Sequence, residues 1–317
     1  MPVSKRKSVQ SKREHIPVYN LSNFNPVHRQ AEVSTIFGYN NIEKSKVIEG
    51  FEIYSSDGLI RSMGPLKSEF YRISLTLKGT LDMQIGLDHY VHQPNTICFT
   101  YPNQIFSKRN ISPDAFGYYI LFKSDFLNDV IPSVKIADEF PFYHTAGKPV
   151  FILAEEEIKT TVELILKIDD ELQHRKTGRV KAIKMYVYLL LLNAKRSYER
   201  QQLTIGLEVS GAESLLSRFK KLVSIHYLTK RQVCNYSDML AVSPNHLNRT
   251  IKRLTGMTAS DHIKEMLVQE AKALLKYTDS SVAQIAYQMN FSDPGSFNRF
   301  FKSATRQTPH NYRSKQD

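Results

Sequence analysis

The chain carries the same short sequence plan twice, fifty residues apart. Residues 243–249 read SPNHLNR and residues 293–299 read DPGSFNR. In each copy a helix-capping residue, Ser243 or Asp293, precedes a proline, which suits the first position of a helix because an N–H there would have no partner. Apolar residues then recur at helical spacing and predict one buried face on each helix. The predicted buried positions are Leu247, Ile251 and Leu254 in the first copy and Phe297, Phe301 and Ala304 in the second.

The opposite face of each predicted helix carries amides and cations. An Asn side chain can pair with adenine, an Arg with guanine, and a Lys neutralises phosphate. One such helix face is commonplace on a protein surface, but two copies in register favour the reading of a major groove. The two sets are Asn245, Asn248, Arg249 and Lys252 in the first copy and Gly295, Asn298, Arg299 and Lys302 in the second.

Each copy follows another short predicted helix, at residues 236–242 and 282–291, so each pair has the plan of a helix-turn-helix unit. Between the two units, Thr258 and Asp261 form a capping box, and the apolar pattern predicts a helix that ends near Lys276. Such a helix is roughly 27–30 Å long. It can therefore place two reading helices in successive major grooves, which lie about 34 Å apart.

The charge of the chain is concentrated at its two ends. The net charge is +12, and residues 213–317 hold 16 Lys and Arg against 8 acidic residues, whereas residues 16–212 hold 22 of each. Residues 1–15 hold five cations against one acid and predict a disordered basic tail. A balanced region followed by a basic one fits a module that binds a polyanion, although a merely well-solvated surface remains the alternative.

The region before the basic module predicts a β-rich domain followed by two helices. Strand-like runs at 71–77, 81–87 and 96–101 are separated by turn residues, which is typical of a sandwich or barrel. From about residue 155 to 201 the apolar period becomes helical and predicts a hairpin of two helices. Its two apolar faces exceed what one small sheet needs, so we expect a homodimer interface there, with packing on the sheet as the alternative. Residues 203–212 are expected to be a linker.

Residues 213–314 resemble the AraC/XylS family of bacterial transcription regulators. The resemblance is carried by SPNHLNRTIKRLTG, EAKALL, VAQIAYQMNFSDPGSFNRFFK and TPHNYR, which occupy 243–256, 270–275, 282–302 and 308–313. It implies a seven-helix domain, residues 213–317, that binds double-stranded DNA and acts on RNA polymerase. In the family both recognition helices contact bases. The matching positions are Asn245, His246, Asn248, Arg249, Gly295, Ser296, Asn298 and Arg299.

Alternatives to base contact stay open for several of these residues. The recurrence of Asn248 and Arg249 as Asn298 and Arg299 also fits a structural role, such as a bond to a neighbouring helix. His246 is equally compatible with a solvated surface position. Gly295 has no side chain with which to read a base, so the second helix is expected to contribute shape and phosphate contacts more than base reading.

The β-rich region, residues 16–202, resembles the cupin-like sensor domain of such regulators. The implied fold class is α+β: a cupin-like barrel with a helical hairpin, then an all-α domain with two helix-turn-helix units. Catalytic cupins hold a metal with an HxH pair, which this chain lacks; His89 and His92 are three apart and are expected to be surface residues. We therefore expect no metal, cofactor or catalytic residue.

A small-molecule effector could occupy an aromatic pocket in this domain. The candidate lining residues lie on strand-like segments, and the alternative is that they are core. They are Phe70, Tyr71, Phe99, Tyr101 and Phe106.

The function that these patterns favour is a sequence-specific DNA-binding transcription regulator. Two other classes compete with it, namely a cupin-like enzyme with a basic appendage and an adaptor whose helical repeat binds protein. The longest apolar run, at 186–192, is too short to span a bilayer, and Cys98 and Cys234 have no metal-ligand spacing. Both observations predict a cytoplasmic protein without a membrane partner.

Overall fold

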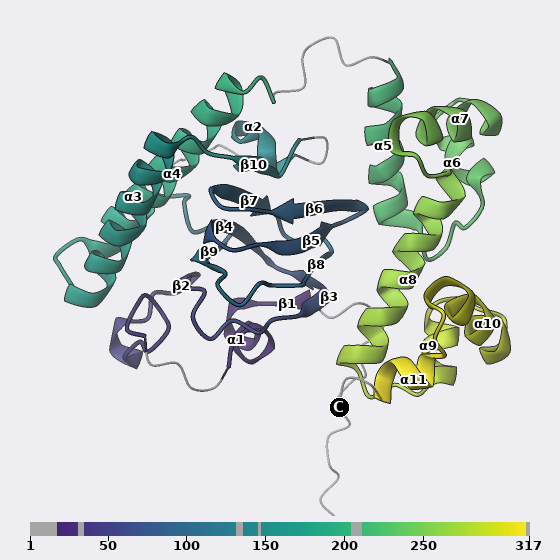
Figure 1. Cartoon of the computed structure of the whole chain (residues 1–317), viewed down its shortest axis with the longest axis horizontal. Coiled ribbons are helices and arrows are strands. Elements are labelled where there is room, and N and C mark those ends of the chain that lie inside the picture. Colours follow the sequence, from purple (N-terminus) through teal and green to yellow (C-terminus); the bar gives the residue numbers. More distant parts are fainter. Residues whose placement is uncertain (1–17, 31–34, 131–135, 145–146, 204–210, 315–317) are drawn as a thin grey trace, which may run out of the picture.

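The computed structural model describes most of the chain as a β-rich region followed by a helical one (Figure 1). The predicted basic tail, residues 1–15, and residues 204–210 of the predicted linker lie outside the described residues. The described ranges are 18–30, 35–130, 136–144, 147–203 and 211–314.

Two five-stranded sheets form the β-rich region, and all neighbouring strands are antiparallel except the pair β1 and β3. In order across the first sheet, the strands are β1 (Val18–Tyr19), β3 (Met63–Ser68), β8 (Phe106–Arg109), β5 (Leu81–Ile85) and β6 (Asp88–His92). In order across the second, they are β10 (Val150–Ile152), β7 (Thr96–Thr100), β4 (Phe70–Lys78), β9 (Phe116–Lys123) and β2 (Phe51–Ser55).

The predicted strands at 71–77, 81–87 and 96–101 are confirmed as β4, β5 and β7. The predicted turns between them are present as well. Gly79 follows β4 with φ +69°, and a Cβ there would lie 2.6 Å from the Cα of Ala115, so only glycine fits. Asn95 takes φ +70° before β7, a conformation that Asn tolerates better than most residues.

Helices cover this β-rich region from outside. The short elements are α1 (Leu21–His28), η1 (Lys44–Lys46), α2 (Ile136–Glu139) and η2 (Pro141–Tyr143). The predicted hairpin is confirmed as α3 (Glu155–His174) and α4 (Arg179–Arg200), which lie antiparallel along one side of the β-rich region (Figure 1).

The hairpin packs its apolar faces into the same core as the sheets. The Tyr198 ring on α4 meets Phe142 and Phe151, with centroids 6.0 and 5.4 Å apart. The expectation that these apolar faces exceed what the sheet can cover is therefore wrong. Within one chain, seven apolar side chains of the hairpin are no more than 2% exposed. They are Ile165, Ile168, Leu172, Ile183, Val187, Leu190 and Leu191.

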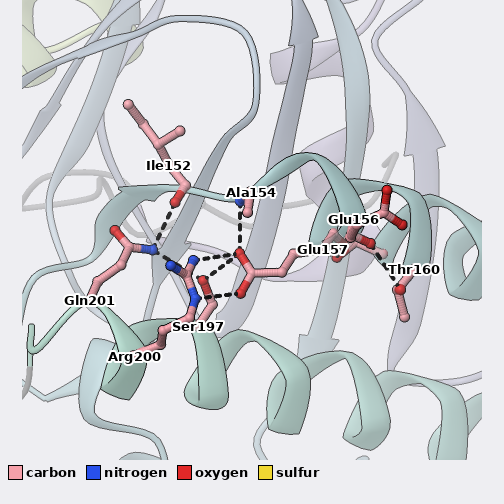
Figure 2. A network of polar contacts seen from close by, with 9 residues as sticks. Ile152, Ala154, Glu156, Glu157, Thr160, Ser197, Arg200 and Gln201 are labelled. Carbon is pink, nitrogen blue, oxygen red and sulfur yellow. Dashed lines mark hydrogen bonds and ion pairs between the residues drawn. The ribbon is translucent and has the colours of Figure 1, made fainter.

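A carboxylate clamps the open end of the hairpin (Figure 2). Glu157, in the first turn of α3, accepts hydrogen bonds from Arg200 Nη2 (2.9 Å), Ser197 Oγ (2.9 Å) and the backbone N–H of Ala154 (2.7 Å). Partial burial acts to raise the pKa of Glu157, but these bonds outweigh it and hold the pKa below its usual value of 4.5. The clamp joins the start of α3 to the end of α4.

The helical region contains the predicted repeat. In Figure 1, α8 runs beside the β-rich region, and α7 and α10 lie on the side of α8 that faces away from the sheets. The elements are α5 (Gly211–His226), α6 (Val233–Met239), α7 (Pro244–Thr255), α8 (Ala259–Tyr277), α9 (Val282–Gln288), α10 (Pro294–Thr305) and α11 (Pro309–Ser314).

Replacing Glu157 by Gln should lower the midpoint of thermal unfolding at pH 7 by roughly 2–4 °C, since the lost contacts are worth about 1 kcal/mol at a partly exposed site. The pKa of Glu157 is lower in the folded chain, so this stabilisation is present above pH 4.5 and is lost as the pH falls through the folded pKa. The difference in unfolding midpoint between wild type and E157Q should therefore become smaller when thermal unfolding is measured near pH 3. Glu156→Gln is the control, because the Glu156 carboxylate forms an ion pair with Lys159, and both side chains are exposed. Equal effects of the two variants would contradict the clamp.

Candidate nucleic-acid interface and interior cavity

The two repeated helices begin as the sequence predicts. Ser243 Oγ accepts a hydrogen bond from the N–H of His246 (3.2 Å), and Asp293 Oδ1 accepts one from the N–H of Ser296 (2.8 Å). The hydrogen bonds from the Ser296 side chain and backbone lower the pKa of Asp293 to about 2. Gly256 ends α7 with φ +77°, whereas Arg306 ends α10 with φ +60°, so the second copy lacks the glycine stop.

The predicted buried faces are confirmed in their first two turns only. The side chains at Leu247, Ile251, Phe297 and Phe301 are fully buried. The third predicted position is wrong in both copies: Leu254 is 38% exposed, and Ala304 is exposed as well. The buried stripe ends one turn earlier than predicted, because the last turn of each helix lies at the rim of the helical core.

Most of the predicted reading residues lie on the exposed side of α7 and α10. Among the ten, Gly295, Ser296 and Asn248 are half-buried. The exposed ones are Asn245, His246, Arg249, Lys252, Asn298, Arg299 and Lys302. The structure therefore brings these seven to the surface of two helices with the same cap and the same buried side.

The two repeated asparagines differ in their contacts. Asn248 Oδ1 accepts a hydrogen bond from the N–H of Ala259 at the start of α8 (3.0 Å), so its amide already joins two helices. Fifty residues after Ala259 stands Pro309, which has no N–H to donate. The equivalent bond cannot form for Asn298. The structural role left open for the asparagines thus applies to Asn248.

Ser296 and Arg299 form a local chain of hydrogen bonds on α10. Ser296 Oγ donates to Asp293 Oδ2 (2.6 Å) and accepts from Arg299 Nη2 (3.0 Å). Ser296 therefore belongs to the helix cap and holds the Arg299 guanidinium near the start of the helix.

The helix α8 separates the two helix-turn-helix units and also contacts the first sheet. Its 19 residues span about 28 Å, close to the length predicted. At its end, Tyr277 OH accepts a hydrogen bond from the N–H of Gly64 on β3 (2.7 Å). Nearer its middle, Gln269 Nε2 donates to the carbonyl of Gly86 (2.9 Å), and Glu265 Oε1 accepts from Gln84 Nε2 (3.0 Å).

An apolar contact reinforces this docking. Leu87 and Ile105 come from the β-rich region, yet they are buried in the hydrophobic core of the helical region. Lys220 on α5 also forms an ion pair with Asp88 on β6. The first sheet is thus joined to the helical region by apolar, hydrogen-bonded and charged contacts.

A cavity of about 310 Å³ lies between the two sheets. Of the five predicted pocket aromatics, only Phe106 lines it. Phe70 and Phe99 are fully buried in the core, and Tyr71 and Tyr101 pack against that core. The residues that line the interior of the cavity include His28, Met63, Arg72, Met83, His92, Phe106, Lys108 and Tyr119.

His92 corrects the expectation of two surface histidines. It is 1% exposed and lines the cavity, while His89 is exposed. The two histidines do face opposite sides of β6, but one of those sides is the interior. Burial lowers the pKa of His92 to about 4, so its ring is neutral at pH 7. In the part of the chain that the structure describes, no group of three or more His, Cys, Asp or Glu side chains is arranged to hold a metal ion.

Within the described ranges, none of the helices combines the length and the apolar character that crossing a membrane requires.

The different contacts of the two asparagines predict different stabilities of their variants. Asn248→Ala should cost about 1 kcal/mol of unfolding free energy, because it leaves the N–H of Ala259 without its acceptor. Asn298→Ala removes no such bond and should leave thermal unfolding unchanged within error. A melting curve of each full-length variant decides this. An unfolding midpoint that drops equally in both would show that the bond from Ala259 contributes nothing specific.

Comparison with known proteins finds relatives among transcription regulators. Residues 236–315 match the model of a helix-turn-helix domain. The HTH-type transcriptional activator RhaS of Enterobacter sp. (strain 638) is 22% identical over 229 residues, 72% of this chain and 73% of that protein. RhaS of Escherichia coli O1:K1 / APEC is 25% identical over 133 residues, 42% of this chain and 45% of the relative.

Solved structures give a weaker likeness. Unsaturated-fatty-acid-bound ToxT from Vibrio cholerae strain SCE256 aligns over 84% of this chain and 95% of its own, with a TM-score of 0.40 and 16% identity. The likeness that bears on function is that of the matched domain, the repeated helix-turn-helix units and the RhaS relatives. These findings support an AraC-type DNA-binding transcription regulator with a β-rich N-terminal region.

Proposed function

We propose that each monomer reads two successive major-groove segments, with α7 in one and α10 in the other. The observation that carries the proposal is the repetition itself. Two helices with the same cap and buried side stand near opposite ends of α8, and both lie on its outer side (Figure 1). At about 28 Å, α8 is close to the 34 Å that separates groove segments on one side of DNA.

The exposed residues divide between base and phosphate contacts. Arg249 and Arg299 are one helical turn into their helices, where a guanidinium can reach the edge of a guanine. Lys252 and Lys302 follow three residues later and suit phosphate. Asn245 and Asn298 are the amides whose side chains are exposed, so they are the better base readers, whereas Asn248 contributes by fixing α7 to α8.

The proposal includes a division of labour along the chain. Residues 213–317 carry DNA binding, residues 16–202 form a cupin-like sensor domain, and residues 203–212 link them. The cavity between the sheets would hold a small-molecule effector. Its walls include β3, β5 and β8, the same sheet that meets α8 at Gly64 and Gln84, so a change in the cavity has a direct path to the DNA-binding helices. Regulation of RNA polymerase would follow from where the protein sits on a promoter.

Replacing either arginine should weaken specific DNA binding. We expect Arg249→Ala and Arg299→Ala each to raise Kd by about 5- to 150-fold, ~1–3 kcal/mol, and to relax the base preference at the contacted position. The target is first obtained by selection from a random double-stranded library with the full-length protein. Kd is then measured by fluorescence anisotropy at near-physiological salt.

Lys221→Ala is the matched control, because it removes an exposed cation of α5 outside the two reading helices. It should change Kd little. If both arginine variants bind the selected DNA as tightly as wild type does, the repeat is a protein-binding scaffold and the adaptor class becomes the better reading.

We also propose that two copies associate through the outer side of the hairpin. Three apolar side chains are exposed there: Leu166 on α3, and Met185 and Leu189 on α4, at 48%, 54% and 38%. Met185 and Leu189 are one turn apart, and Leu166 lies about as far from the hairpin tip as they do. A second copy would bury this group, and a dimer would present four reading helices to DNA.

Charges placed on α4 should separate the copies. The double variant Met185→Glu, Leu189→Glu is expected to sediment as a monomer at micromolar concentration, where wild type sediments as a dimer, since each glutamate would lose its hydration in the interface. Thr160→Glu adds a charge elsewhere on the exposed side of α3 and should remain dimeric. A wild-type protein that is monomeric at these concentrations would refute the interface.

A further inference from the structure

Two cations from opposite sheets meet inside the cavity. Arg72 lies on β4 of the second sheet and is 5% exposed, and Lys108 lies on β8 of the first sheet and is 6% exposed. Both line the cavity, and Arg72 is close enough to disfavour the charge of Lys108. Cations this deeply buried are rare in proteins unless they are paired.

Neither cation has an anionic partner among the residues that the structure describes. No ion pair of Arg72 or Lys108 is formed there, and Arg72 Nη2 is buried without a hydrogen bond. Arg72 instead stacks over the Phe106 ring, 3.9 Å from its centroid. The carboxylate that lines the cavity, Asp57, accepts a hydrogen bond from Ser55 Oγ.

A third buried cation, whose partners Asp57 and Tyr119 line the cavity, has a structural role. Arg29 is 5% exposed, and its guanidinium donates to the carbonyls of Ser55 and Asp57 and to Tyr119 OH. These bonds satisfy Arg29 within the fold. Arg72 and Lys108 differ from Arg29 in this respect, because they are buried without an anionic partner among the described residues.

Apart from Asp57 and the exposed Arg61, the remaining lining residues supply neutral polar atoms and apolar surface. His28 donates from Nδ1 to the carbonyl of Phe24, at 2.7 Å, and its Nε2 is buried without a partner, as is His92 Nε2. Burial lowers the pKa of both rings, so neither adds a charge at pH 7. Met63, Met83 and Phe106 form an apolar side of the cavity.

We infer that this cavity binds a small organic anion, with its carboxylate or phosphate group between Arg72 and Lys108 and its apolar part against the methionines. The inference rests on the proposed role of the β-rich region as an effector domain and adds the class of effector. A volume of about 310 Å³ is at the lower end of small-molecule sites, so the ligand is compact. An arginine and a lysine are the side chains that bind such acidic groups, the arginine in a bidentate manner.

The burial of the two cations favours tight binding of an anion. Desolvation lowers the pKa of Lys108 well below its usual value, and that of Arg72 to about 10. Both cations are therefore held at a cost that an entering anion would offset. The same logic predicts that the empty protein is less stable than it could be, as is common where a site is kept for binding.

The first test needs no ligand. In Tris chloride buffer, full-length Lys108→Met should unfold at a higher temperature than wild type, by on the order of 5 °C, because an unpaired buried ammonium is replaced by an apolar side chain of similar length. Lys78→Met, which removes an exposed lysine at the end of the strand that carries Arg72, should leave the midpoint unchanged. A midpoint of Lys108→Met at or below that of wild type would overturn the inference, since Lys108 would then be structural.

The second test identifies the acidic group. Benzoate, hexanoate and inorganic phosphate are titrated calorimetrically into wild type, beside the neutral benzyl alcohol and hexanol. At least one acid should bind, with affinity lost at least 10-fold in Lys108→Met and retained in Lys78→Met; carboxylates and phosphate distinguish the two head groups. Binding of the neutral compounds as tightly as their acids, or no binding of any acid, would overturn the anion class. Arg72→Met is measured in parallel where it folds.

The two proposals fail separately. Loss of selected-DNA binding by wild type, with anion binding intact, would refute the regulator reading and leave the anion site standing. Binding of the selected DNA by wild type, with no binding of any anion, would refute the anion site and leave the proposed DNA-binding function standing.

Discussion

The helix α8 is the element on which the rest of the structure depends. Most of its side chains are buried, because it is the shared wall of several interfaces. It packs against α7 of the first helix-turn-helix unit and against α9 and α10 of the second. It also packs against α5, α11 and β3 of the first sheet. Its length sets the separation of the two reading helices, and its contacts with Gly64 and Gly86 fix how they stand relative to the cavity. Small shifts of α8 would change both the separation of these two helices and their position relative to the cavity.

The repeat that surrounds α8 is close to, but not fully, symmetric. Asn248 is tied to the N–H of Ala259, and Pro309 removes the equivalent donor from the second copy. Gly256 is matched by Arg306 in the same left-handed conformation, in which glycine carries no Cβ penalty. The first unit is thus the more firmly built of the two and presents Asn245 and Arg249. The second keeps Asn298 exposed and has Gly295 where the first has Asn245, so the two helices are expected to read DNA unequally.

Much of this architecture could be predicted from the residues alone, because it depends on local spacing. Caps at Ser243 and Asp293, the helical hairpin and the strands between residues 70 and 100 follow from patterns a few residues long. Three features could not be predicted in this way, because each depends on which distant element lies opposite. They are the contact of Asn248, the burial of His92 and the docking of α8 on β3. Four of the five pocket aromatics do not line the cavity for the same reason: aromatic strand residues fill a core as readily as they line a site.

One signal for the cavity was nevertheless present in the sequence. In YRISLTL the polar residues Arg72, Ser74 and Thr76 alternate with apolar ones, which on a sheet at the surface would mark the solvent side. In this fold both sides of β4 are enclosed, since the hairpin and the core cover one and the first sheet covers the other. The polar side therefore faces the cavity, and all three residues line it.

The proposed anion site would connect the cavity to the DNA-binding helices. An anion that neutralises Arg72 and Lys108 would draw β4 and β8 together, since each cation comes from a different sheet. The strand β8 pairs with β3 and β5, whose residues Gly64 and Gln84 bond to α8. An attraction across the cavity is therefore applied to the same sheet that holds the DNA-binding helices in place. A neutral ligand in the same space would exert no comparable pull. In the proposed mechanism the charge of the effector would therefore matter more than its shape.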